Sequence, residues 1–185
     1  MTVDNNKIIW NSNYEKLLCY QKAVVIYDLT FHFCSRFIAK SDRTFDQMIQ
    51  AARSGKQNIV EGYTDATTSF EIAIKLYNIA RGSLKELLED YRDYMRARHL
   101  VEWDMTSREV NAMREIGRKH TDSKYYIELA ENRNDEVIAN MAIVLLHQED
   151  MLLQKFIESE VERFTEEGGF REKMTHLRLE RRDKR

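Results

Sequence analysis

The chain has 185 residues, contains no proline and only six glycines, and 32% of its residues are charged. Proline in a helix interior removes a backbone donor and clashes with the preceding turn at a cost of about 3 kcal/mol, so its absence favours long uninterrupted helices and an all-α fold. The formal net charge of −2 excludes a global positive field that would draw the whole molecule to nucleic acid.

Three long helices are predicted in the first half of the chain. The first is expected over residues 14–39, the second over 44–62, and the third from a cap at Thr67-Thr68-Ser69 to about residue 98. Ser41-Asp42 is expected to end the first helix and to cap the second. The apolar positions of the first helix recur at spacings of four and three, which predicts one buried stripe: Tyr20, Val24, Tyr27, Phe31, Cys34 and Ile38.

Small and polar residues on the second and third helices predict close helix packing. Gly55 lies on the apolar stripe of the second helix, where another backbone can approach closely. Gly82 lies in the middle of the third helix, where glycine costs about 1 kcal/mol relative to alanine. A tight crossing of the third helix against Gly55 would explain why glycine is tolerated at position 82. The alternative is that Gly82 marks a strained or kinked part of the helix. Gly62 is expected to end the second helix. Asn58 and Ser83, if buried, need hydrogen-bond partners and would set the helix register.

Shorter helices and one further long helix are predicted in the second half. Thr106 to Glu109 resembles a cap for a helix reaching about residue 119, and Asp122-Ser123 opens another through residue 131. A long apolar segment over 136–164 is predicted to be helical, and Gly168-Gly169 separates it from a short basic helix over 170–182.

The end of the sequence is strongly basic. Residues 171–185 carry seven lysines and arginines against three acidic residues, whereas residues 126–170 carry three against eleven. Such a tail can lie on RNA phosphates, on an acidic patch of a partner, or on the acidic segment of a neighbouring subunit, and a solvated tail without a partner is the alternative. Its candidate contacts are Arg178, Arg181, Arg182, Lys184 and Arg185.

No residue pattern points to catalysis, a metal or a cofactor. His147 and Asp150 share a helix face, but two ligands do not complete a metal site. Cys34 lies on an apolar stripe, which favours a structural thiol over a nucleophile. A glycine-rich phosphate loop is missing. No signal peptide and no membrane-length apolar run is seen, so a cytoplasmic, non-enzymatic protein is expected.

Three blocks of sequence, residues 20–23, 51–62 and 79–87, resemble a known family. This four-helix-bundle family includes proteins encoded in bacterial ribosomal RNA intervening sequences and the accessory variability determinant of diversity-generating retroelements. The resemblance covers about residues 14–120. Residues 136–185, with the motif at 166–172, resemble the suffix region of the subgroup called four-helix-bundle suffix proteins.

The resemblance implies an antiparallel up-down four-helix-bundle core over 1–120 and a C-terminal helical suffix with a basic tail over 121–185. It implies a homo-oligomer, since ring-shaped homopentamers are known in the family, and no catalytic residues. The retroelement relatives bind a reverse transcriptase and nucleic acid through a basic surface. In this chain the candidate phosphate contacts around the first two helices are Lys22, Arg36, Lys40, Arg43, Arg53 and Lys56.

Two functions follow as hypotheses. The first is a nucleic-acid-binding accessory protein, acting on RNA or DNA with or without a reverse transcriptase partner. The second is a protein–protein scaffold or adaptor ring, because the apolar segment over 136–164 needs burial that a closed four-helix core does not supply.

Overall fold

The computed structural model describes residues 13–167 together with residues 175, 178, 179 and 182. Within these residues there is no strand, which confirms the all-α prediction, and no helix is both long enough and apolar enough to span a membrane. The principal elements are the 3-10 helix η1 (Tyr14–Lys16) and the helices α1 (Leu18–Phe37), α2 (Arg43–Asp65), α3 (Phe70–Ala97), α4 (Arg108–Lys119), α5 (Ser123–Ala130) and α6 (Asp135–Glu167).

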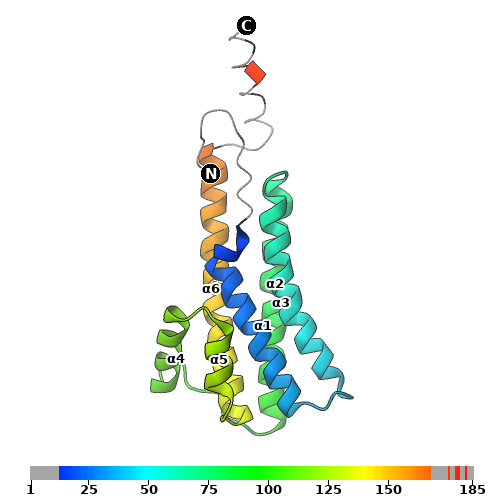
Figure 1. Cartoon of the computed structure of the whole chain (residues 1–185), viewed down its shortest axis with the longest axis vertical. Coiled ribbons are helices and arrows are strands. Elements are labelled where there is room, and N and C mark those ends of the chain that lie inside the picture. Colours follow the sequence, from blue (N-terminus) through cyan, green and yellow to red (C-terminus); the bar gives the residue numbers. More distant parts are fainter. Residues whose placement is uncertain (1–12, 168–174, 176–177, 180–181, 183–185) are drawn as a thin grey trace.

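Four long helices lie side by side. α1 packs against α2 and α6, and α3 also packs against α2 and α6, so each helix has two long neighbours. α1 and α3 run in one direction, and α2 and α6 run in the other (Figure 1). The two short helices lie beside this group, with α4 against α6 and α5 against α1.

α6 contains the longest continuous buried stretch in the described part of the chain. Every residue from 138 to 146 is buried, because α1, α3 and α4 all pack against this part of the helix. A helix that is enclosed on all sides has a continuous apolar sequence instead of a stripe. The hydrophobic core therefore crosses the boundary predicted at residue 120. Residues of α5 and α6 pack against the helices formed by residues 1–120.

The helix starts follow the capping residues that the sequence indicates. Asp42, Ser69, Ser107 and Asp122 each accept a hydrogen bond from a backbone N–H in the first turn of α2, α3, α4 and α5, respectively. A side-chain cap of this kind contributes about 1 kcal/mol to helix stability, because it satisfies a backbone donor that has no partner within the helix.

The two buried glycines of α2 allow α3 to approach closely. A Cβ added at Gly55 would lie 2.6 Å from Cγ and Cδ2 of Leu84, and one added at Gly62 would lie 2.6 Å from Cε1 of Tyr77. Gly62 thus lies inside α2 and does not end it. A Cβ at Gly82 would have no neighbour within 4 Å, so the expected crossing of Gly82 against Gly55 is wrong. The residue of α3 that packs against Gly55 is Leu84.

The apolar stripe predicted for α1 is only partly buried. Cys34 and Ile38 belong to the core, but Phe31 is 50% exposed. A second set of positions with the same spacing of four and three points inward instead: Cys19, Ala23, Ile26, Thr30 and Phe33. The spacing alone did not distinguish the two sets, because both lie on narrow faces of the same helix.

Candidate functional site

Lys22 is the one predicted nucleic-acid contact on α1–α2 that the structure buries. Its side chain is 3% exposed, and its ammonium donates a hydrogen bond to the backbone carbonyl of Gly117 at the end of α4. An ammonium in this position cannot reach a phosphate group at the surface. The prediction that Lys22 contacts nucleic acid therefore does not fit this structure.

The other predicted cations of α1 lie at the end of the molecule where α1 meets α2. The guanidinium of Arg36 donates to the carbonyl oxygen of Ala130 at 2.9 Å and to that of Arg133 at 3.1 Å. These carbonyls lie at and just beyond the end of α5, so Arg36 acts as a side-chain cap for that helix. Lys40 is exposed in the turn that follows α1.

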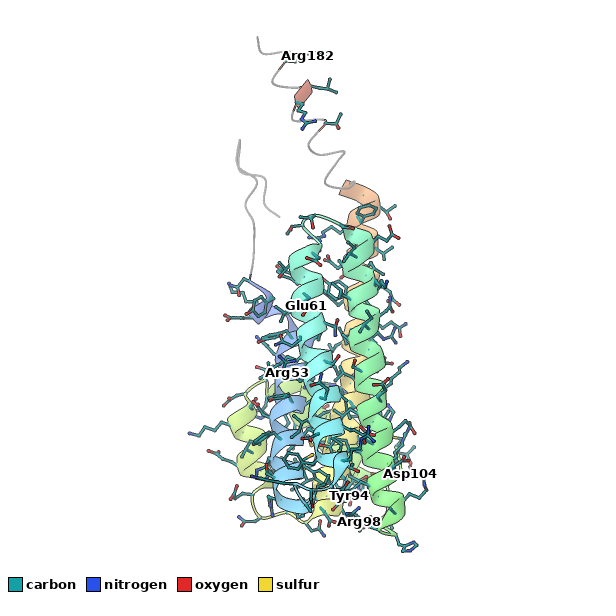
Figure 2. All side chains as sticks on the ribbon, turned by 90° about the vertical axis from the view of Figure 1, so that its right-hand side faces the viewer. Arg53, Glu61, Tyr94, Arg98, Asp104 and Arg182 are labelled. Carbon is teal, nitrogen blue, oxygen red and sulfur yellow. The ribbon has the colours of Figure 1, made fainter. Side chains whose placement is uncertain are left out.

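Further cations surround this end. Arg43 is exposed at the start of α2, and Arg98 at the end of α3 stacks on the ring of Tyr94 with its Cζ 3.7 Å from the ring centroid (Figure 2). Figure 2 shows Arg98 at the end of the molecule where α1 meets α2. The pKa of Asp42 is lowered by hydrogen bonds from Thr44 and also by the positive charge of Arg98. We call the following five residues the basic end: Arg36, Lys40, Arg43, Arg98 and Arg133.

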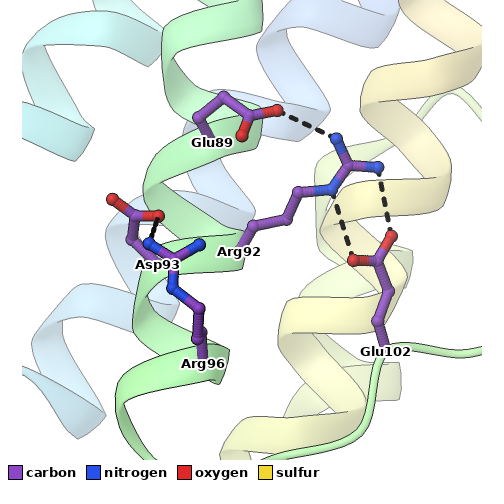
Figure 3. Close-up of polar contacts among 5 residues, drawn as sticks. All are labelled: Glu89, Arg92, Asp93, Arg96 and Glu102. Atoms are coloured by element: carbon purple, nitrogen blue, oxygen red, sulfur yellow. Dashed lines mark hydrogen bonds and ion pairs between the residues drawn. The ribbon is translucent and has the colours of Figure 1, made fainter.

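The basic end differs from its surroundings in its ion pairs. Arg92 on α3 contacts Glu102 at 3.2 Å and Glu89 at 2.9 Å, and Arg96 contacts Asp93 at 2.6 Å (Figure 3). Such pairs leave little net charge to attract an anion. Within the described part of the chain, no carboxylate forms an ion pair with any residue of the basic end.

The remaining predicted cations lie elsewhere. Arg53 is exposed on α2, away from Arg98 (Figure 2), and Lys56 is half-buried with its Nζ 4.1 Å from the ring centroid of Tyr27. In the tail, Arg178 and Arg182 are exposed. The predicted contacts Arg181, Lys184 and Arg185, and the Gly168-Gly169 junction, lie outside the described residues.

Ser83, one of the predicted helix-packing residues, links α3 to α2 through Ser54. The hydroxyls of Ser54 and Ser83 are hydrogen-bonded at 2.9 Å, and Asn58 donates from Nδ2 to the carbonyl of Ser54 at 2.8 Å. A hydrogen bond between two half-buried hydroxyls holds one register of the two helices, since a shift would leave both without this partner.

A second polar group lies in the interior and was not predicted from the sequence. We call it the buried polar cluster: Lys22, Gly117, Tyr126, Gln148 and Glu149. Gln148 donates from Nε2 to the carbonyl of Arg114 at 2.9 Å, and the Tyr126 hydroxyl donates to the carbonyl of His120 at 2.9 Å. Together with Lys22, these side chains satisfy carbonyls in and just after the last turns of α4.

Glu149 is the unusual member of this cluster. It is fully buried, and neither carboxylate oxygen has a hydrogen-bond partner among the residues that the structure describes. Burial raises the pKa of Glu149 well above its usual value, and the nearby Lys22 opposes that rise. Burial also lowers the pKa of Lys22. The sequence did contain a signal for the burial of Lys22. Lys22 lies three residues after Cys19 and four before Ile26, which places it on the same helix face as these two buried residues.

The polar segment around His147 does not gather metal ligands. Asp150 accepts a hydrogen bond from Nε of Arg81 at 2.8 Å, and burial together with Arg92 lowers the pKa of His147. Among residues 13–167 and the four described tail residues, no group of three histidine, cysteine or acidic side chains is placed to hold a metal ion.

Comparison with known proteins gives no relative for this chain: no protein-family model, curated protein or solved structure matches it.

Proposed function

We propose that this chain is a non-enzymatic, oligomeric helical-bundle protein that binds RNA or DNA as an accessory factor, with the basic end as its contact surface. The proposal treats α1, α2, α3 and α6 as an antiparallel four-helix bundle of the kind found in the family that the sequence resembles. It rests on the observation that five cations gather at one end without carboxylate ion pairs among the described residues.

The size of the basic end suggests why an oligomer would be needed. A protein that makes roughly 6–10 phosphate contacts must place that many accessible cations on one surface. Arg36 already serves as a helix cap, so one copy offers fewer than this number. Repetition of the basic end in several subunits multiplies the contacts on one nucleic acid, and avidity then raises the overall affinity.

Fluorescence anisotropy with a structured RNA and a duplex DNA, measured over a salt series, tests the proposal. Reversing three charges of the basic end (Lys40→Glu, Arg43→Glu and Arg98→Glu) should weaken binding by more than about tenfold. It should also make the slope of log K against log salt shallower by about 3, because each lost phosphate contact removes roughly 0.9.

A matched control carries the same change in net charge at exposed lysines elsewhere: Lys16→Glu, Lys75→Glu and Lys155→Glu. The control should keep most of the affinity. Equal loss in both triple variants would show that only the net charge matters, and absence of binding at low salt would remove the proposed function altogether.

The alternative function is a protein–protein scaffold or adaptor ring without nucleic-acid binding. The stretch 138–146 of α6 is buried within this chain and needs no partner, but Met151 is 62% exposed on the same helix, and Ile72 and Ile79 are exposed on α3. Size-exclusion chromatography with light scattering, with absorbance at 260 and 280 nm, distinguishes the two. A smaller subunit count for Met151→Glu, with no co-purified nucleic acid in the wild type, would favour the scaffold.

A further inference from the structure

α4 is a short helix that buries few of its residues. It has 12 residues, and its buried residues are Val110, Met113 and Gly117. Among the helices it packs chiefly against α6. A helix of this length is marginally stable by itself in water, so its order depends on its tertiary contacts. An element with few buried apolar contacts is among the first to open locally while the rest stays folded.

The chain on the N-terminal side of α4 is anchored and can serve as a hinge. Glu102 is held by Arg92 on α3 (Figure 3), and the backbone N–H of Trp103 donates to Oδ1 of Asn140 at 2.7 Å. Asn140 in turn donates to the carbonyl of Val101 at 2.9 Å. Opening of α4 therefore needs no disruption of α3 or α6, because the hinge follows these fixed residues.

The C-terminal half of α4 contacts two side chains of the buried polar cluster, Lys22 and Gln148. Lys22 reaches the carbonyl of Gly117 from α1, and the negative end of the helix dipole makes this a favourable place for an ammonium group. Gln148 reaches the carbonyl of Arg114 from α6. These contacts exist only while α4 is docked, and its departure would give both side chains access to water.

Glu149 makes the docked state sensitive to protons. Its carboxyl is fully buried and receives no hydrogen bond, which is very unfavourable for the charged form and much less so for the neutral acid. The titratable or charged side chains around it are Lys22 and Cys19 on α1, Asp150 beside it on α6, the Tyr126 ring on α5 next to Lys22, and Arg81 and Lys85 on α3, which neutralise Asp150. α4 itself presents backbone carbonyls to this cluster.

We propose that α4 is a lid over Lys22 and Glu149, and that its opening increases with pH because Glu149 releases its proton to water when the lid is open. In the closed state burial holds the pKa of Glu149 well above its usual value, and in the open state contact with water returns the pKa toward that value. The closed lid thus binds a proton that the open lid releases. Closure is fully favoured below the open-state pKa and is lost as pH rises toward the closed-state pKa.

Hydrogen–deuterium exchange of the full chain between pH 5.5 and 8, corrected for the intrinsic exchange rates, tests this. Amides of α4 should exchange through an opening whose equilibrium constant rises about tenfold per pH unit until the closed-state pKa is reached. Amides of residues 138–146 should exchange much more slowly, since they report on opening of the core. Glu149→Gln should reduce the pH dependence of α4 to less than about twofold over this range.

Two further variants serve as controls. Glu158→Gln makes the same substitution at an exposed position of α6 and should leave the slope unchanged. A Cβ at Gly117 would overlap Oε1 of Gln148, so Gly117→Ala should displace that side chain and increase opening at every pH without changing the slope.

Three results would contradict the proposal that α4 is a lid. Exchange of α4 in step with residues 138–146 would mean that α4 opens only when the whole chain unfolds. A flat pH profile in the wild type would mean that Glu149 is already ionised beside Lys22. A slope that persists in Glu149→Gln would assign the proton to another group. The inference does not depend on the proposed function, and neither test affects the other.

Discussion

The same substitution at two glycines should have opposite effects on stability. Both Gly55 and Gly82 lie within helices, so replacing either by alanine removes a conformational penalty of about 0.8–1.0 kcal/mol. At Gly82 the new methyl group meets nothing within 4 Å. Gly82→Ala should therefore stabilise the protein by about 1 kcal/mol and raise its Tm by roughly 2–4 °C.

At Gly55 a second effect opposes the first. The new Cβ would lie 2.6 Å from two carbon atoms of Leu84, which is 4% exposed and enclosed by the core. Overpacking of this kind costs typically 1–3 kcal/mol, because the neighbours must leave their preferred rotamers. After the propensity gain is subtracted, Gly55→Ala should be destabilising by up to about 2 kcal/mol, and should be about 1–3 kcal/mol less stable than Gly82→Ala.

Urea denaturation followed by circular dichroism at 222 nm measures both free energies of unfolding. A double-mutant cycle with Leu84→Ala identifies the contact, since removing the Leu84 side chain makes room for the new methyl group and should produce a coupling energy of about 0.5–3 kcal/mol. If Gly55→Ala were as stabilising as Gly82→Ala, or if the cycle showed no coupling, Leu84 would have free space around it. The close approach of α2 and α3 would then not explain Gly55.

Two smaller predictions concern single side chains. Ser107→Ala removes the acceptor for the Val110 N–H, at 3.2 Å, and the loss of about 1 kcal/mol should increase hydrogen exchange in α4 roughly fivefold; no change would mean that the cap does not stabilise α4. Burial raises the pKa of both Cys19 and Cys34 to about 12, so at pH 8 neither thiol of the native protein should react readily with Ellman's reagent, whereas both should react in guanidinium chloride. Rapid reaction of either thiol under native conditions would contradict its placement in the core.

The helices and their starts were largely predictable from local sequence. Asp42, Ser69, Ser107 and Asp122 cap helices in the structure, and each is a residue type whose side-chain oxygen suits that position. The register of α2 against α3 was also indicated, since Gly55, Ser54 and Asn58 lie on or beside the contact. The caps depend on neighbours within a few residues, whereas the register of α2 against α3 depends on contacts 29 residues apart that the small and polar residues only suggested.

The candidate site was much less predictable. Arg36, Lys40 and Arg43 were identified correctly as exposed cations, but Arg98 and Arg133 joined the basic end only because α3 and α5 end beside α1. Lys22 was assigned to the surface from its charge alone. Its burial depends on the carbonyl of Gly117, which is 95 residues away in the sequence.

The sequence by itself determined that this chain is helical, where most of its helices begin, and which positions tolerate close packing. These properties follow from backbone propensity, capping and the spacing of apolar residues, all of which act over one or two turns. Only the tertiary structure decided that residues 138–146 of α6 are enclosed on all sides, which face of α1 points inward, and that Lys22 and Glu149 share the interior. Those outcomes depend on contacts between residues far apart along the chain, where burial and Coulomb interactions are set by which helices become neighbours.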